Sequence, residues 1–143
     1  MSEERQRLTA FLERLTSELE RLGPVPLVEA KGTVEVSAAS ESGFAVRAAV
    51  GDDGIAVGYD GWHWHEEFES DLEALNCFLS GVFGESRLAV STRCGFAHSW
   101  TAEGLVDGAW VPVSTTGYFL VPFWCRRQVK YLRNDRRLRA AGD

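Results

Sequence analysis

The sequence predicts a single α+β domain in which about three helices pack on an antiparallel sheet. Two segments carry apolar residues at intervals of three and four, which is the spacing of an amphipathic helix. Two other regions alternate apolar and polar residues, and turn-forming dipeptides divide them into short strands. We therefore expect the element order α-βββ-α-βββ-α, with two three-stranded meanders.

Length and composition are consistent with one domain over residues 1–143, with frayed ends near residues 1–4 and 137–143. Of the 143 residues, 45% are hydrophobic and 25% are charged, as in an average globular domain. A chain of this length typically forms one hydrophobic core. The composition excludes a collagen-like repeat, a disordered tail and a disulfide-rich miniprotein.

The first helix is expected over residues 2–22. Gly23 and Pro24 end it, because Gly adopts the left-handed cap conformation and Pro cannot continue a helix. One stripe holds its apolar residues, which are Leu8, Phe11, Leu12, Leu15, Leu19 and Leu22. The stripe predicts docking on a sheet, and pairing with a second chain is the alternative.

Three antiparallel strands are expected from residue 27 to about residue 60. Their apolar positions are Val34 and Val36, then Phe44, Val46, Ala48 and Val50, then Ile55, Val57 and Tyr59. Residues 40–43 and 51–54 have the composition of hairpin turns. Asp60-Gly61 is interpreted as the end of this first meander.

A second helix is expected over residues 70–83. Ser70 followed by Glu73 is a capping box, and Gly84 provides the stop signal. The apolar stripe of this helix consists of Leu72, Leu75, Phe78, Leu79 and Val82.

The second meander begins with a strand in which Leu88, Val90 and Thr92 alternate with other residues. Asp107-Gly108 predicts a two-residue hairpin turn between strands at 97–106 and 109–115. Pro112 indicates that the last of these strands lies at a sheet edge, because Pro cannot donate to a ladder.

A short basic helix is expected to close the chain. Cys125, Val129 and Leu132 have helical spacing, whereas residues 118–121 fit either a strand or the start of a helix. A basic ribbon beside that stripe would consist of Arg126, Lys130, Arg133 and Arg137. The ribbon is interpreted either as a solvated face or as a docking strip for an anionic partner. The order of elements resembles that of the small acidic class I chaperones of type III secretion, in element order alone.

Charge and cysteine usage indicate a cytoplasmic protein with no membrane partner. The net charge is −6 and the sequence pI is about 5.1, which is not the balance of a nucleic-acid-binding domain. Residues 126–143 carry +5, however, whereas residues 1–125 carry −11. Cys77, Cys94 and Cys125 are odd in number and form no CxxC pair, as is typical of reduced cytosolic thiols. No apolar run marks a signal peptide or a membrane span.

A possible metal site rests on His63 and His65, which strand geometry would place on one face, opposite Trp62 and Trp64. Glu67, Cys94 or His98 would have to supply a third ligand. No HxxxH, HExxH or paired CxxC spacing supports zinc, so we expect no metal and no cofactor.

Catalysis is not favoured either. Cys94 and His98 lie four residues apart and have the chemistry of a thiol nucleophile and its base, with Arg93 beside the thiol. Working dyads usually come from distant segments, and an inert buried Cys94 is the alternative. The sequence has no GxSxG, GxGxxG or P-loop pattern.

Aromatic residues are concentrated in residues 96–124, either as a Trp-rich core or as an exposed patch. Aromatic and Arg side chains are enriched at interaction hot spots. The predicted partner-binding residues are Trp100, Trp110, Trp124, Arg126, Arg127, Lys130, Arg133 and Arg137.

The leading hypothesis is therefore a small non-catalytic protein that binds another protein, in the manner of a chaperone, inhibitor or immunity protein, as a monomer or homodimer. The first alternative is a small-molecule-binding or metal-binding domain, or an enzyme, built on the residues His63, His65, Cys94 and His98. The second is nucleic-acid binding by the basic C-terminal helix, which the −11 of the remaining chain opposes.

Overall fold

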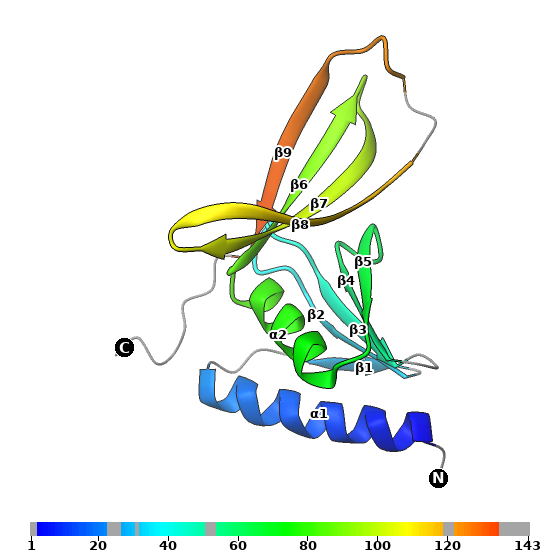
Figure 1. Ribbon diagram of the computed structural model, residues 1–143, viewed down its shortest axis with the longest axis vertical. Coiled ribbons are helices and arrows are strands. Elements are labelled where there is room, and N and C mark those ends of the chain that lie inside the picture. The colour runs from blue at the N-terminus through cyan, green and yellow to red at the C-terminus, as the bar shows by residue number, and fades with distance from the viewer. Residues whose placement is uncertain (1–2, 23–26, 31, 51–53, 119–121, 135–143) are drawn as a thin grey trace.

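The computed structural model describes residues 3–22, 27–30, 32–50, 54–118 and 122–134. Within these ranges it contains two helices and nine strands, and the strands form antiparallel sheets of five and four (Figure 1). The α+β class is confirmed. The third helix and the division into two three-stranded meanders are wrong. Of the expected frayed ends, residues 1–2 and 137–143 lie outside the described residues.

Helix α1 covers Glu3–Leu22 and confirms the first predicted helix. Its stripe buries Phe11, Leu15 and Leu19 against the rest of the core. The ring of Phe11 meets Phe78 of the second helix edge-on, with 6.4 Å between centroids. The apolar stripe of α1 is thus buried because the helix docks on the core beside the sheet, as the stripe predicted. The stop signal at Gly23 and Pro24 lies outside the described residues.

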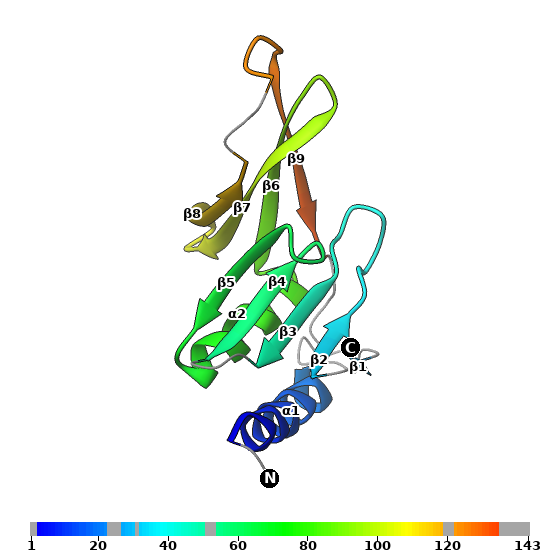
Figure 2. The same ribbon diagram turned by 90° about the vertical axis from the view of Figure 1, so that its right-hand side faces the viewer.

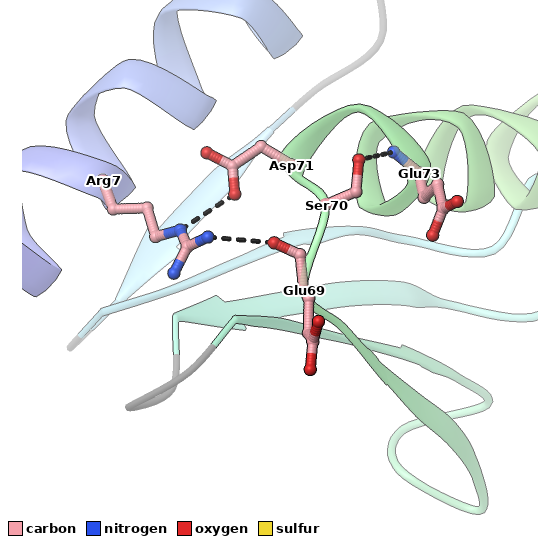
Figure 3. A network of polar contacts seen from close by, with 5 residues as sticks. All are labelled: Arg7, Glu69, Ser70, Asp71 and Glu73. Atoms are coloured by element: carbon pink, nitrogen blue, oxygen red, sulfur yellow. Dashed lines mark hydrogen bonds and ion pairs between the residues drawn. The ribbon is translucent and has the colours of Figure 1, made fainter.

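Helix α2 covers Asp71–Val82, and Ser70 is its N-cap. The Ser70 hydroxyl accepts a hydrogen bond from the Glu73 backbone N–H at 3.3 Å, which satisfies one of the unpaired donors of the first turn (Figure 3). Arg7 of α1 links the two helices, because its Nε donates to Asp71 Oδ1 at 2.8 Å and its Nη2 donates to the Glu69 carbonyl at 3.0 Å (Figure 3). The acidic first turn of α2 thus has a cation beside it.

The five-stranded sheet has its strands in chain order. They are β1 (Val28–Ala30), β2 (Thr33–Val36), β3 (Val46–Val50), β4 (Ile55–Tyr59) and β5 (Trp64–Phe68). The predicted three strands correspond to β2, β3 and β4. The predicted turn at residues 40–43 is present, and the Gly43 N–H donates to the Ser40 carbonyl at 3.0 Å. Most of the other predicted turn, residues 51–53, lies outside the described residues.

Asp60-Gly61 does not end this sheet. Both residues have positive φ, 57° and 70°, which lets the chain reverse and add β5 beside β4. In the pairing of β4 with β5, Tyr59 lies opposite Trp64 and Val57 lies opposite Glu66. The first meander was therefore predicted with three strands where the sheet has five, because β1 and β5 were not recognised. At β5 the reason is that a turn signal reports a reversal and not where a sheet stops.

The four-stranded sheet has the order β8-β7-β6-β9. Its strands are β6 (Ser86–Arg93), β7 (Phe96–Val106), β8 (Ala109–Gly117) and β9 (Arg127–Arg133). The Asp107-Gly108 hairpin is confirmed, with φ of 50° and 79°, and so is the edge position of Pro112 on β8. The sheet projects away from the helices, and α1 lies at the opposite end of the molecule (Figures 1 and 2).

Strand β9 replaces the predicted basic helix. All seven of its residues pair with β6, from Arg127 opposite Arg93 to Arg133 opposite Arg87. Val129 and Leu132 are three positions apart, which fits a helix, but a segment with so few apolar residues gives only a weak periodicity signal. Val129, Tyr131 and Arg133 follow the two-residue alternation of a strand. The unpaired backbone groups along the edge of β6 favour the strand, because β9 satisfies them.

Asn134 joins the two sheets. It is completely buried, and its Oδ1 accepts hydrogen bonds from the backbone N–H groups of Ala39 at 3.0 Å and Phe44 at 3.1 Å. Its Nδ2 donates to the carbonyls of Phe44 at 2.7 Å and Gly81 at 2.9 Å. One side chain at the end of β9 thus holds the loop before β3 and the end of α2.

Candidate binding surface

The outer face of the four-stranded sheet carries alternating residues of β6 and β9. On β6 and β9, Leu88, Val90 and Leu132 point into the core. The alternate residues of both strands form what we call the arginine face, together with Trp110 of β8: Arg87, Ala89, Ser91, Arg93, Trp110, Arg127, Val129, Tyr131 and Arg133. Tyr131 is 52% exposed. No helix among the described residues covers this face (Figure 1).

Arginine and aromatic side chains are stacked at the inner end of the arginine face. The Arg87 guanidinium lies 4.5 Å from the ring centroid of Trp110 and 4.1 Å from that of Tyr131. Arg133 lies 5.1 Å from the Trp110 ring. Arg87 Nε also donates to Glu103 at 2.6 Å, and Arg133 Nε donates to the Gly84 carbonyl at 2.7 Å. These contacts fix the positions of the Trp110 and Tyr131 rings.

The outer end of the arginine face is electropositive. Arg127 Nε donates to Ser91 Oγ at 3.0 Å, and Arg93 Nη1 donates to the Cys125 carbonyl at 2.7 Å. Burial, and then the charges of Arg93 and Arg127, lower the pKa of His98 below its ordinary value of 6.5. The His98 Nε2 atom is buried without a hydrogen-bond partner. Both effects favour the neutral imidazole of His98, because a further positive charge beside Arg93 and Arg127 is unfavourable.

Exposed aromatic side chains gather beyond this end, in what we call the aromatic tip: Phe96, Tyr118, Phe123 and Trp124. Phe123 is 77% exposed and Trp124 is 75% exposed, with their rings 5.3 Å apart. Phe96 and Tyr118 have centroids 6.0 Å apart. The segment before β9 lies at the end of the molecule farthest from α1 (Figures 1 and 2). Large apolar side chains so exposed are typical of interaction sites.

A disulfide between Cys94 and Cys125 holds the aromatic tip to the sheet. Cys94 and Gly95, with φ of 53° and 75°, form the turn between β6 and β7, and Cys125 directly follows Trp124. The interpretation of these two cysteines as reduced thiols is therefore wrong, and a disulfide-bonded Cys94 offers no thiolate nucleophile. Burial raises the pKa of the remaining Cys77 thiol to about 12, so it is protonated at neutral pH.

The histidines occupy separate environments. His63 lies in the turn before β5, where its ring stacks on Trp100 at 4.6 Å and its Nδ1 is 3.3 Å from Asp60 Oδ2. His65 lies on β5, which begins at Trp64, so His63 precedes the strand and the prediction that both share one strand face is wrong. His98 lies beside the outer arginines. Within the described residues, no group of three or more His, Cys, Asp and Glu side chains could hold a metal ion.

The predicted partner-binding residues are distributed over the surface and the core. Trp124 is the exposed tryptophan of the aromatic tip and Trp110 is half-buried in the arginine stack, whereas Trp100 is 5% exposed and belongs to the core. The basic residues that remain exposed are Arg126, Arg127, Lys130 and Arg133. Because β9 is a strand, Lys130 lies on the face opposite Arg127 and Arg133, and the predicted ribbon is divided. Arg137 lies outside the described residues.

The predicted partner-binding residues omit several large side chains of this surface: Arg87, Arg93 and Tyr131 of the arginine face, and Phe96, Tyr118 and Phe123 of the aromatic tip. A signal for Arg87 and Arg93 is present in the sequence: they are six positions apart in one predicted strand, and an even separation places both on the same face. The helical interpretation of β9 hid Tyr131, because its strand neighbours were not recognised. Phe123 belongs to the aromatic concentration at residues 96–124, but no local pattern indicates which of those aromatic residues are exposed.

No family model matches the chain, and no curated protein or solved structure matches it either. None of the helices in the described part of the chain is long and apolar enough to cross a membrane.

Proposed function

We propose that this chain is a non-catalytic binding protein that docks on another protein through the aromatic tip and the arginine face. The supporting observation is the presentation of Phe123 and Trp124, both at least three-quarters exposed on a backbone held by a disulfide. Arg93 adds a second restraint, since its Nη1 donates to the carbonyls of Cys125 at 2.7 Å and Phe123 at 3.4 Å. Aromatic anchors that are rigid before binding lose less entropy on association.

Charge favours a partner with an acidic surface. Residues 86–133 contain six basic and two acidic residues, and Arg127 on this face is exposed. Complementary charge raises the association rate and excludes partners of the wrong sign. Binding should therefore weaken as salt is added.

A long nucleic acid fits this surface less well than a protein does. Arg87 is paired with Glu103, and Arg133 is bonded to a backbone carbonyl, so both guanidinium groups are partly engaged. The first 85 residues carry a net charge of −11, which repels a polyanion that extends beyond the four-stranded sheet. A chaperone, an inhibitor or an immunity protein would each use a compact surface of this kind.

The experiment compares three forms of the protein as bait in cells of the organism that encodes it. They are the wild type, the double variant Phe123→Ala/Trp124→Ala, and the control Leu72→Ala, which removes an exposed apolar side chain from α2. Captured material is treated with nuclease, and each partner is then titrated with the purified forms.

We expect one stoichiometric protein to bind the wild type and the control, and the double variant to bind at least about 30-fold more weakly, since hot-spot truncations cost about 2 kcal/mol or more. Arg127→Glu should reduce both the affinity and its salt dependence. A partner that binds all three forms equally, or a capture that nuclease abolishes, would overturn the proposal.

A further inference from the structure

A cavity of about 280 Å³ lies where the edge of the five-stranded sheet meets α2 and the four-stranded sheet. Its apolar wall includes Tyr59, Trp64 and Phe68 from the first sheet, and Leu105 and Val113 from the second. This cavity is distinct from the aromatic tip and from the arginine face. Its volume lies at the small end of the range for ligand pockets, roughly 300–1,000 Å³.

Two carboxylates belong to the cavity, Glu66 and Glu85. Glu66 lies between Trp64 and Phe68 on β5, opposite the buried Val57 of β4, so it is on the inward face of the sheet. Its neighbour Glu67 is on the outward face and is exposed. Glu85 is exposed and directly precedes β6, and the described lining residues include no Lys, Arg or His. The cavity therefore has a negative potential and apolar walls.

Two neighbouring groups are held in their neutral forms. Burial is the main cause that raises the pKa of Cys77 to about 12 and the pKa of Tyr59 well above 10, and the nearby Glu66 carboxylate contributes to both. The Tyr59 hydroxyl donates its proton to the Cys77 carbonyl. Its oxygen also lies 3.4 Å from Cys77 Sγ and is hydrogen-bonded to Ser86, so the phenol is fixed in the cavity wall in its neutral form.

We propose that this cavity binds a small organic cation, with an ammonium group between Glu66 and Glu85 and a compact apolar body against Trp64, Phe68 and Leu105. The ammonium supplies up to three hydrogen-bond donors, which suit carboxylate and hydroxyl oxygens. The apolar body gains free energy by leaving water. The small volume limits that body to about one ring.

An inward carboxylate on an edge strand has another possible role, because a charge there deters pairing with the edge of another sheet. That role requires no ligand and no contribution from Glu85. Binding of a small organic cation that depends on Glu66 and Glu85 distinguishes the ligand site from protection of the sheet edge.

The test uses 2-phenylethylamine as the probe and 3-phenylpropanoate as its anionic counterpart, at pH 7.5 and low salt. Calorimetry and tryptophan fluorescence report binding to the wild type, to Glu66→Gln/Glu85→Gln, and to the control Glu67→Gln. A filling variant, Gly104→Val, adds carbon to the cavity wall, where a Cβ has 3.8 Å to the nearest atom, Val113 Cγ2. Thermal unfolding confirms that each variant is folded.

We expect the amine to bind the wild type and Glu67→Gln equally, and to bind the double variant and the filling variant at least about tenfold more weakly. The phenylpropanoate should not bind. The proposal is overturned if the amine does not bind, if the carboxylate binds as tightly, or if Glu66→Gln/Glu85→Gln keeps full affinity. Phe123→Ala/Trp124→Ala should leave amine binding unchanged, so this result and the test of protein binding are independent.

Discussion

The two sheets differ in charge and in what stabilises them. Residues 1–85 contain 17 acidic and 6 basic residues, whereas residues 86–133 contain 2 acidic and 6 basic ones. The four-stranded sheet contributes only 6 of the 23 buried hydrophobic residues among those described. The first region is thus a packed core with its helices on one side of a sheet, and the second is an extended basic surface.

That contrast shows how a thin sheet can present large exposed side chains. The first region gains stability from burying apolar area. The second depends on particular bonds: the Cys94–Cys125 disulfide at its outer end, the stacked Arg87 at its inner end, and Asn134 at the junction. Changes to these bonds should affect the second region selectively, except at the junction, where both regions should respond.

The largest effect is expected from Asn134→Ala, which removes the junction. It leaves the N–H groups of Ala39 and Phe44 and the carbonyls of Phe44 and Gly81 without their partner. Three of these four groups are buried, and a buried group left unpaired costs about 1–3 kcal/mol, so the expected loss is at least about 3 kcal/mol. Urea unfolding measures it. The exposed Asn76→Ala is the control, and a loss below about 1 kcal/mol for Asn134→Ala would contradict the role given to Asn134.

The next effect is expected from opening the disulfide, through the double variant Cys94→Ser/Cys125→Ser. The bridge spans 31 residues, and closing a loop of this size contributes about 2–4 kcal/mol. Hydrogen exchange should accelerate in β6 and β9 and stay unchanged in α1. A reductant should act on the wild type in the same way and have no further effect on the double variant. Equal acceleration in both regions would contradict the selective dependence of the second region on the disulfide.

A smaller effect, confined to the first region, is expected from Ser70→Ala. Loss of the bond from Glu73 N–H to the Ser70 hydroxyl should destabilise the protein by about 1 kcal/mol. Arg7→Ala should cost less, about 0–1 kcal/mol, because the Arg7 and Asp71 side chains are 32% and 38% exposed. Urea unfolding ranks the two, and the reverse order would show that the link between helices matters more than the cap.

The smallest effect concerns pH and the second region. Because the pKa of His98 is lowered in the folded protein, the unfolded chain takes up the proton more readily. The contribution of neutral His98 to the free energy of unfolding is therefore present above pH 6.5. It is lost as the pH falls through 6.5 towards the pKa of His98 in the folded protein. NMR titration should find the His98 pKa below 6.5 and closer to it in Arg127→Gln. An unchanged pKa in that variant would remove Arg127 as a cause.

Local patterns were sufficient for most elements. Helices α1 and α2 follow from apolar stripes with clear stop or cap residues, and the β7–β8 hairpin follows from Asp107-Gly108, which readily adopts positive φ. These signals reside within a few residues of the structure they produce. The charge asymmetry of the chain is also visible in composition alone, although its match to the two sheets is not.

The remaining features depend on residues far apart in the chain. Val129 and Tyr131 became part of a strand because β6 had an open edge, and Trp100 was buried while Trp124 was exposed because of what lies against each. The pairing of Cys94 with Cys125, and the hydrogen bonds of Asn134 over 53 to 95 positions, follow only from the packed chain. Amino-acid order thus specifies elements through short-range spacing and turn chemistry. Packing selects among the alternatives, because burial and long-range hydrogen bonds exist only once the sheets are assembled.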